Sequence, residues 1–174
     1  RYSSVIFHNS WKMDASRRDL TINAIYLDLE GNIFDPFEGV RDLMIGRVEF
    51  IGKMVDRLKE DYLRLLRYIR FYSKYSKFNI NEKKLTIIKK YSKKIKILSK
   101  ERIIDEQRKI FSEDFEISLR SAEMMRKTNL DIECYGEKFE FSKIRELKKL
   151  LTKVSWIKKI SILFQKSNNR NILK

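Results

Sequence analysis

The chain has 174 residues, of which 43% are hydrophobic and 12% aromatic, a composition that excludes a disordered segment and supports a packed core. Its single cysteine, Cys134, excludes an internal disulfide framework and fits a reducing compartment. No apolar run approaches the roughly 20 residues that span a bilayer and no leader peptide opens the sequence, so we expect a cytoplasmic protein with no membrane partner. The first residue is Arg1 rather than methionine, inside a predicted strand, which favours a fragment of a longer chain.

Charge is divided unevenly along the chain. Residues 1–50 carry six basic and eight acidic side chains, a net of −2, whereas residues 51–174 carry 33 basic and 16 acidic ones, a net of +17. This change near residue 50 indicates a boundary between two units with different partners. The basic unit either binds a polyanion such as a nucleic acid or presents solvated lysine-rich helices, and composition alone leaves both open.

The first fifty residues have a mixed α/β pattern. The expected elements are a strand over 2–7, a helix entered at 14–19 and continued to 25, a hairpin of strands 25–29 and 33–35, a loop over 35–39, a helix over 40–43 and a strand over 47–51. Gly31 marks the hairpin turn. The sole histidine, His8, follows the first strand and is expected to be an edge residue rather than a catalytic base.

From residue 56 onward the apolar period is helical. One stripe recurs at spacings of three and four through Leu58, Tyr62, Leu65, Leu66, Ile69 and Tyr72. A second helix is expected to begin at Asn81, a third to be capped by Ser99, a fourth to cover 117–128, and further helical pieces to fill 142–165. Cys134 is expected in a loop, and Trp156, Ile157, Ile160 and Leu163 are expected to form a packing stripe. The fold class is therefore predicted as α+β, with a partial mixed α/β start followed by an all-α remainder.

The densest charged group is Asp61, Arg64, Arg67 and Arg70, which recur at intervals of three. On one helix they would wind along the polar side, with Asp61 beside Arg64. An isolated pair of this kind is most often a surface ion pair.

The same pair could also recognise a base. A carboxylate only accepts hydrogen bonds and a guanidinium only donates them, and cytosine and adenine both present an amino donor beside a ring-nitrogen acceptor. Uracil and guanine reverse that pattern, so a fixed Asp61/Arg64 pair could admit C and A and reject U and G. Arg67 and Arg70 would then remain for phosphates.

Four motifs follow one another in order: R-R-D-x-T-x-N-A at 17–24, D-P-F-x-G-x-x-D-L at 35–43, E-D-x-x-R-x-x-R at 60–67 and E-R-I-x-x-E at 101–106. This series resembles the family of class II tRNA nucleotidyltransferases (CCA-adding enzymes) and bacterial poly(A) polymerases, from residue 1 to about 112. The resemblance implies three parts. Residues 1–51 would be the C-terminal part of a nucleotidyltransferase head, 52–112 a helical neck for nucleotide selection and RNA binding, and 113–174 the start of a helical body.

The resemblance also implies roles for single residues. Six positions correspond to nucleotide-binding residues of the family. Asp19 would lie near the ribose and Arg18 would also contact the nucleotide. Asp61 and Arg64 would be the pair that templates CTP or ATP, and Arg67 and Arg70 would make further nucleotide contacts. The segment 35–42 corresponds to a flexible element coupled to the switch from C to A addition. The carboxylates that bind Mg²⁺ in the family lie upstream of every matched motif, so we expect no catalytic and no metal-binding residue in this sequence, and no activity of the chain alone. The Asp28-Leu29-Glu30 run has the spacing of such a pair but falls at the hairpin turn.

The resemblance leaves several functions open. Addition of CCA to the tRNA 3′ end from CTP and ATP is favoured over poly(A) addition, because poly(A) enzymes often have proline where Tyr62 stands. A separately encoded head segment could be a partner, or the chain could be a non-catalytic RNA-binding remnant or subunit. A helical DNA-binding protein is disfavoured by the α/β start and by the lack of a helix-turn-helix signature.

Overall fold

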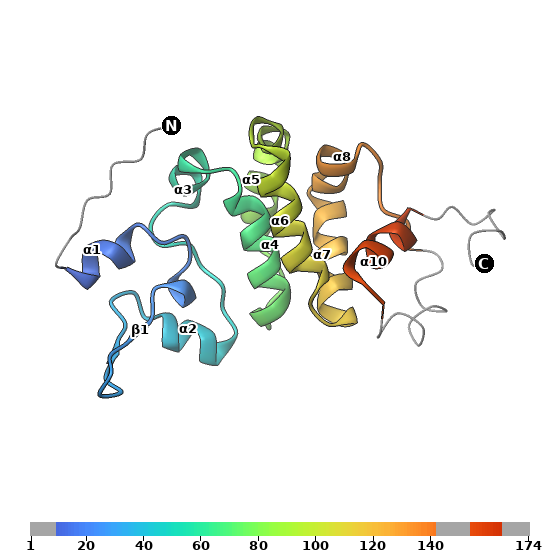
Figure 1. Cartoon of the computed structure of the whole chain (residues 1–174). Coiled ribbons are helices and arrows are strands. Elements are labelled where there is room, and N and C mark those ends of the chain that lie inside the picture. Colours follow the sequence, from blue (N-terminus) through green and yellow to red (C-terminus); the bar gives the residue numbers. More distant parts are fainter. Residues whose placement is uncertain (1–9, 142–153, 165–174) are drawn as a thin grey trace.

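The computed structural model of the protein describes residues 10–141 and 154–164 (Figure 1). In chain order its elements are α1 Trp11–Ser16, the 3-10 helix η1 Thr21–Asn23, β1 Tyr26–Leu27, β2 Ile33–Phe34, α2 Gly39–Ile45, α3 Met54–Glu60, α4 Arg64–Tyr75, α5 Glu82–Tyr91, the 3-10 helix η2 Ser92–Ile97, α6 Lys100–Phe111, α7 Phe115–Lys127, α8 Leu130–Tyr135 and α10 Trp156–Leu163. The α+β class is confirmed. The predicted strand over 2–7 and His8 lie outside the described residues, as do positions 142–153 and 165 of the helical pieces predicted over 142–165.

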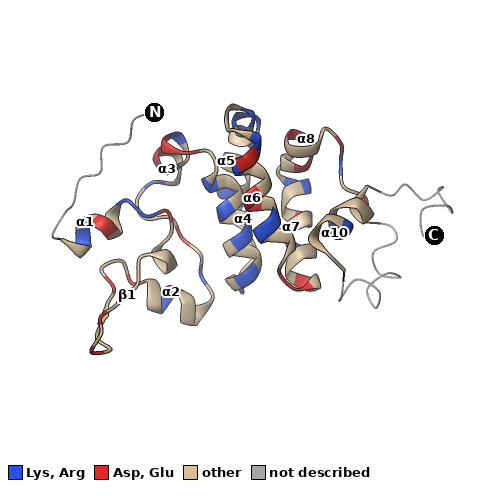
Figure 2. Cartoon of the chain, viewed as in Figure 1, with Lys and Arg blue, Asp and Glu red and all other residues tan. Residues whose placement is uncertain are grey.

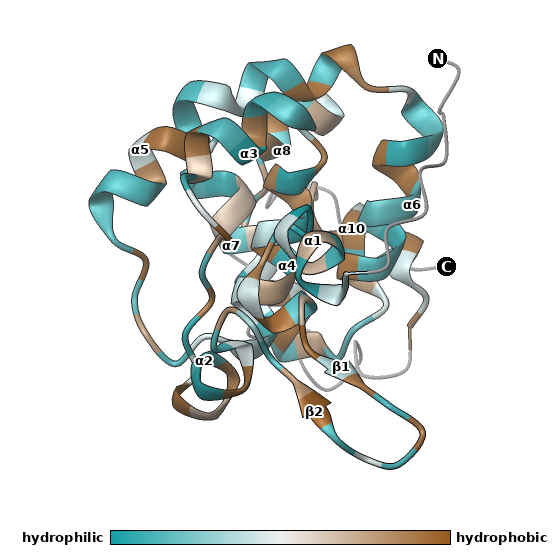
Figure 3. Ribbon diagram, turned by 90° about the vertical axis from the view of Figure 1, so that its left-hand side faces the viewer, coloured by the Kyte–Doolittle hydropathy of each residue, from teal (hydrophilic) through white to brown (hydrophobic). Residues whose placement is uncertain are grey.

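The predicted hairpin is present and projects from the N-terminal part (Figure 3). Its two strands are antiparallel, with Tyr26 opposite Phe34. Gly31 closes the turn at a φ of 88°, a left-handed conformation that glycine adopts without a Cβ clash. The indole of Trp11 on α1 packs 5.7 Å from both the Tyr26 and the Phe34 ring, so one face of the hairpin is held against α1.

Two predictions for the N-terminal part are wrong. The helix expected over 14–25 ends instead at Ser16, and residue 20 is extended. Asp19 accepts the Leu20 N–H with its own carboxylate at 3.0 Å, which competes with a helical hydrogen bond, and Leu20 then pairs with Phe50. The strand expected over 47–51 is also not formed as a strand, and the bridge at Phe50 is its one β-type pairing among the described residues.

The predicted apolar stripe is buried except at Tyr62, which is partly buried, but it does not lie on one helix. Leu58 is on α3, whereas Leu65, Ile69 and the rest of the buried stripe are on α4. The chain is extended at Asp61, with φ −156° and ψ 112°, and the Asp61 carboxylate accepts the Leu63 N–H at 3.0 Å. This local turn ends one helix and starts the next, so the expectation of a continuous helix was wrong.

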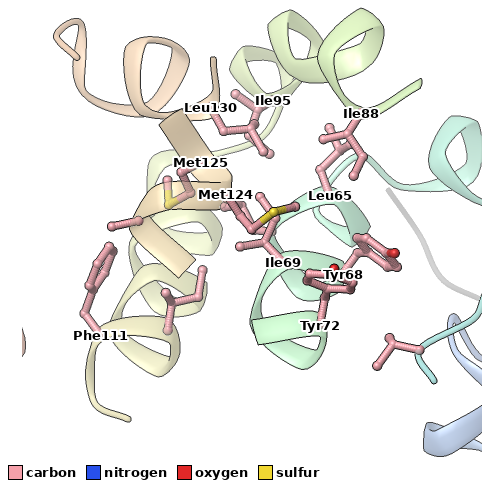
Figure 4. Packing of buried hydrophobic residues seen from close by; sticks show 14 of the residues in the cluster. Leu65, Tyr68, Ile69, Tyr72, Ile88, Ile95, Phe111, Met124, Met125 and Leu130 are labelled. Atoms are coloured by element: carbon pink, nitrogen blue, oxygen red, sulfur yellow. The ribbon is translucent and has the colours of Figure 1, made fainter. Parts of the chain in front are cut away.

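The other predicted helices that the structure describes begin close to where they were expected, although the Ser99 side chain makes no capping hydrogen bond at the start of α6. The Asn81 side chain accepts the Lys83 N–H at 2.7 Å and caps α5, α6 begins directly after Ser99, and α7 covers the expected fourth helix. Helices α4, α6 and α7 pack side by side (Figure 1). Their buried side chains include Ile69 and Tyr72 of α4, Phe111 of α6, and Met124 and Met125 of α7 (Figure 4). The same cluster includes Leu20, Val48 and Phe50, so the acidic and basic units share one core.

Two predictions near the C-terminus need correction. Cys134 lies within α8 rather than in a loop, and its burial raises the pKa of the thiol to about 12. Ile160 and Leu163 are buried and Trp156 packs against the same core cluster, as expected, but Ile157 is 58% exposed and is not part of the stripe. Within the described residues, no helix combines the length and the apolar character that crossing a membrane requires.

Candidate nucleotide-binding site

The end of α1 presents two arginines around one carboxylate. Asp14 forms ion pairs with Arg17 and, at 2.9 Å, with Arg18, and it accepts the Tyr26 hydroxyl at 2.5 Å. The hydrogen bond from Tyr26, followed by those from the two arginines, lowers the pKa of Asp14 well below its ordinary value. The Arg18 guanidinium also lies over the Tyr26 ring, at 5.8 Å from its centre. Arg18 is therefore oriented by its neighbours, and its side chain is still 49% exposed to a ligand.

Asp19 is the buried centre of the predicted set. It is 5% exposed and accepts hydrogen bonds from the Leu20 N–H, from Asn23 Nδ2 at 3.0 Å and from Arg67 Nε. Burial raises the pKa of Asp19, but the hydrogen bonds from Arg67 and Asn23 outweigh it and hold the pKa below its ordinary value. The same pair raises the pKa of Arg67. An ionised pair therefore joins the R-R-D motif to α4.

Arginines recur along α4, as the blue segments of Figure 2 show, but they differ in accessibility. Arg67 is 32% exposed and borders solvent beside Asp19. Arg70 is 14% exposed and donates to Glu106 of α6 at 2.6 Å, and its guanidinium lies 4.2 Å from the centre of the Phe71 ring. Glu106 is 1% exposed. Arg70 therefore ties α4 to α6, and its expected contact with a nucleotide stays a prediction.

Arg64 reaches the C-terminal end of α1. Its Nη1 donates to Glu60 Oε2 at 2.5 Å and to the Arg57 carbonyl at 3.2 Å, and its Nη2 donates to the Arg17 carbonyl at 3.3 Å. The carbonyl end of a helix carries partial negative charge, which favours a cation there. The Arg64 side chain is 15% exposed, so most of its surface is already covered.

Asp61 faces a different part of the molecule. Its Oδ2 accepts from Arg102 Nη2 at 2.6 Å, and its Oδ1 accepts the Leu63 N–H. Asp61 lines a groove of about 430 Å³ together with Lys59, Tyr62, Ser99 and Arg102, among others. The Asp61 side chain is 32% exposed.

The expected side-chain pair between Asp61 and Arg64 is not formed. In residues 10–141 and 154–164, the Asp61 carboxylate pairs with Arg102, and the Arg64 guanidinium pairs with Glu60. The spacing of three residues brings side chains together only on a continuous helix, and Asp61 precedes α4. The structure therefore brings Arg18, Asp19, Arg64 and Arg67 together around the end of α1, whereas Asp61 lines a separate groove with Arg102.

Sequence reasoning missed Arg57. Its Nε donates to the Ile51 carbonyl at 2.9 Å, its Nη1 donates to both Glu60 oxygens at 3.0 Å, and its Nη2 donates to the Ser16 carbonyl. Arg57 and Arg64 thus contact consecutive carbonyls at the end of α1. A signal in the sequence could have identified Arg57. It lies three residues before Glu60 of the E-D pair, on the same helix, α3.

The segment predicted to be a flexible element is tied down at both ends. Asp35 accepts the N–H groups of the first two residues of α2, from Gly39 at 2.7 Å and from Val40 at 2.8 Å. Asp42 is 2% exposed and accepts from Thr21 Oγ1 at 2.7 Å and from Arg47 Nε at 2.6 Å. A Cβ at Gly39 would lie 2.2 Å from the Thr21 carbonyl oxygen, so only glycine allows this approach. The coupling role of the segment stays a prediction.

The carboxylates of the site do not form a set of metal ligands. Each one, namely Asp14, Asp19, Glu60, Asp61 and Glu106, is paired with at least one arginine. In the part of the chain that the structure describes, no group of three or more His, Cys, Asp or Glu side chains could hold a metal ion. These residues do not fit Mg²⁺, whose expected ligands stay a prediction for a segment outside this sequence.

Comparison with known proteins identifies the family. The family model "Poly A polymerase head domain" matches residues 1–49, and "Probable RNA and SrmB- binding site of polymerase A" matches residues 77–130. The CCA-adding enzyme of Lactococcus lactis subsp. cremoris (strain MG1363) is 34% identical over 157 residues, 89% of this chain and 37% of that enzyme. The chain belongs to the CCA-adding enzyme and poly(A) polymerase family.

Further relatives of this nucleotidyltransferase family agree in sequence and in fold. The mitochondrial CCA tRNA nucleotidyltransferase 1 of Homo sapiens is 49% identical over 74 residues, 42% of this chain and 17% of that protein. The crystal structure of the Bacillus stearothermophilus CCA-adding enzyme in complex with CTP superposes with a TM-score of 0.65 at 26% identity, over 86% of this chain and 36% of that one. The chain thus spans between 17% and 37% of the length of these family members.

Proposed function

We propose that this chain is the nucleotide-selecting part of an enzyme that adds C and A to the 3′ end of tRNA. The relatives that share most of its sequence are CCA-adding enzymes, and one solved relative is a complex with CTP. The observation that carries the proposal is the meeting of two motifs at the Asp19–Arg67 ion pair, which places the R-R-D segment against the arginines of α4.

The accessible arginines suit a triphosphate. Arg18 and Arg67 are 49% and 32% exposed, and each is held by a carboxylate, so each can turn free N–H groups toward phosphate oxygens. Asp19, a buried acceptor beside them, is assigned to a ribose hydroxyl and not to the phosphates, because a carboxylate has no hydrogen to donate to a phosphate oxygen. The two arginines would bind the anionic phosphates through charge-assisted hydrogen bonds, which a neutral sugar or base cannot form as strongly.

Base selection is assigned to Asp61 and Arg64. Asp61 offers an acceptor for the amino group that cytosine and adenine share, and Arg64 offers donors for their unprotonated ring nitrogen. Both groups are engaged with protein partners, so Arg64 has to leave Glu60 or Arg17 before the two can read one base. Uracil and guanine would leave Asp61 facing a carbonyl oxygen, an unfavourable contact that is the proposed source of specificity.

A second candidate is poly(A) addition by an enzyme of the same family. The specific observation in favour of poly(A) addition is that the descriptions of both matching family models name poly(A) polymerase or polymerase A. Use of ATP alone on RNA of any sequence, without CTP, would distinguish it. The third possibility, a non-catalytic RNA-binding subunit, is supported by the net charge of +17 over residues 51–174.

The deciding experiment is incorporation of radiolabelled CTP and ATP into tRNA that lacks its 3′ CCA, with magnesium. The chain is assayed alone and mixed with a head segment that carries the metal-binding carboxylates. We expect activity only in the mixture, abolished by Asp61→Ala and by Arg64→Ala. Incorporation by the chain alone would contradict the assignment of the metal ligands to another segment, and tRNA binding without incorporation in either case would leave the RNA-binding subunit.

A further inference from the structure

Arg102 has a single polar partner within the described residues. This arginine is in the first turn of α6, and its Nη2 donates to Asp61 Oδ2 at 2.6 Å across 41 residues of sequence. Arg102 belongs to the fourth motif, E-R-I-x-x-E at 101–106, but neither the hydrogen-bond argument for Asp61 nor the resemblance assigned a role to it. Its contact is nevertheless the only long-range hydrogen bond that the Asp61 carboxylate forms in the described part of the chain.

Asp61 needs such support because of where it lies. It stands in the short connection between α3 and α4, and its side chain is 32% exposed, so helix packing does not fix its rotamer. The Leu63 N–H fixes one carboxylate oxygen and Arg102 fixes the other. Two donors at two oxygens determine both the direction and the plane of the carboxylate.

The support itself is firm. The opposite face of α6 is buried in the core, through Glu106, Gln107, Ile110 and Phe111. Arg102 therefore extends from a helix that packing holds in place, and both ends of its contact line the groove of about 430 Å³ between α3 and α6. Recognition groups that are held by a second layer of hydrogen bonds keep their geometry better than free ones.

We propose that Arg102 is a positioning residue for base selection, which holds the Asp61 carboxylate toward the groove in the orientation that accepts an amino group. This inference rests on the proposed function, because it explains how Asp61, which the proposed function uses for base selection, is oriented. Without Arg102, only the Leu63 N–H holds the Asp61 carboxylate, so its plane is no longer fixed, and the discrimination between C and U weakens more than binding of the triphosphate does.

The test compares the binding of CTP and UTP to the chain and to three variants by isothermal titration calorimetry. Arg102→Gln removes the charge and the paired donors, Arg102→Lys retains the charge and one donor, and Arg108→Gln is the matched control. Arg108 is on the same helix and forms an exposed ion pair with Asp105 at 2.8 Å, with side chains 58% and 57% exposed against 48% and 32% for Arg102 and Asp61. We expect the CTP preference to fall on the order of tenfold in Arg102→Gln, to recover in part in Arg102→Lys, and to be unchanged in Arg108→Gln.

Each other outcome has a defined meaning. An unchanged CTP preference in Arg102→Gln, or an equal loss for CTP and UTP, overturns the positioning role and leaves the proposed function standing. If the unaltered chain itself binds CTP no better than UTP, the assignment of base selection fails and this inference fails with it. Thermal melting of each variant verifies folding, and Arg102→Lys carries the comparison if Arg102→Gln does not fold.

Discussion

Arg67 on α4 donates its Nε hydrogen to the carboxylate of Asp19, which lies 48 residues earlier and is 5% exposed. Both residues belong to motifs that are separated by a hairpin and two helices. Their ion pair fixes how the N-terminal part meets the helical part, alongside the contacts of Arg57 and Arg64 with the end of α1. The candidate site therefore depends on an interaction that also contributes to stability.

Asp19→Asn tests this dual role. The amide keeps the shape of the carboxylate but loses the charge that Arg67 requires, so we expect the free energy of unfolding to fall by about 2 kcal/mol at pH 7. The pKa of Asp19 in the folded protein lies below the ordinary value of 3.8, so its contribution is fully present above that value and is lost as pH falls through the folded pKa. Urea unfolding at several pH values should show the gap between the two proteins closing below pH 3.8. A gap that is constant with pH would contradict the ionised pair.

The pair between Arg70 and Glu106 leads to a different expectation, because both side chains are nearly covered, at 14% and 1% exposure. Glu106→Gln leaves the Arg70 charge with a neutral partner in the core, and we expect the free energy of unfolding to fall by about 3 kcal/mol. Asp105→Asn on the same helix is the control, since Asp105 is 57% exposed and its pair with Arg108 should be worth under about 1 kcal/mol. Equal losses in the two variants by urea unfolding would show that the burial of Glu106 has no special weight.

The sequence predicts much of this fold, because the features concerned are local. The glycine turn at Gly31, the cap at Asn81 and the apolar stripe of α4 each depend on residues within one turn of one another, and each is confirmed. The break at Asp61 was missed because a spacing of three residues suits a helix, while the competing side-chain hydrogen bond to Leu63 leaves no mark in a periodicity.

The partners of the site residues were less accessible to prediction. Motifs identified Asp61, Arg64, Arg67 and Arg70 as a group, but three of their four carboxylate or arginine partners come from distant segments, 36 to 48 residues away. Only tertiary packing brings these partners close. Resemblance to the family could name the residues, whereas it could not state which of them are free to meet a ligand.

Gly39→Ala tests the contact between α2 and η1. A Cβ at this position would lie 2.2 Å from the Thr21 carbonyl oxygen, a backbone atom that cannot move alone. We therefore expect the free energy of unfolding to fall by about 2 kcal/mol or more. Gly31→Ala is the comparison. No atom lies within 4 Å of a Cβ at Gly31, and its cost comes only from the φ of 88°, about 1 kcal/mol. Chemical denaturation should rank Gly39→Ala as the more damaging change, and the reverse order would contradict the close approach.

Arg18→Ala separates binding from stability. The Arg18 side chain is 49% exposed, and its pair with Asp14 is one that solvent screens, so we expect little change in the melting temperature. Loss of a guanidinium that faces the triphosphate should weaken CTP binding by about tenfold, and the difference should shrink as salt is raised. Arg41→Ala is the matched control, because Arg41 forms a similar pair with Glu38 at 2.9 Å on the exposed surface of α2. If both variants weaken CTP binding equally, the effect is one of net charge, and Arg18 has no particular place in the site.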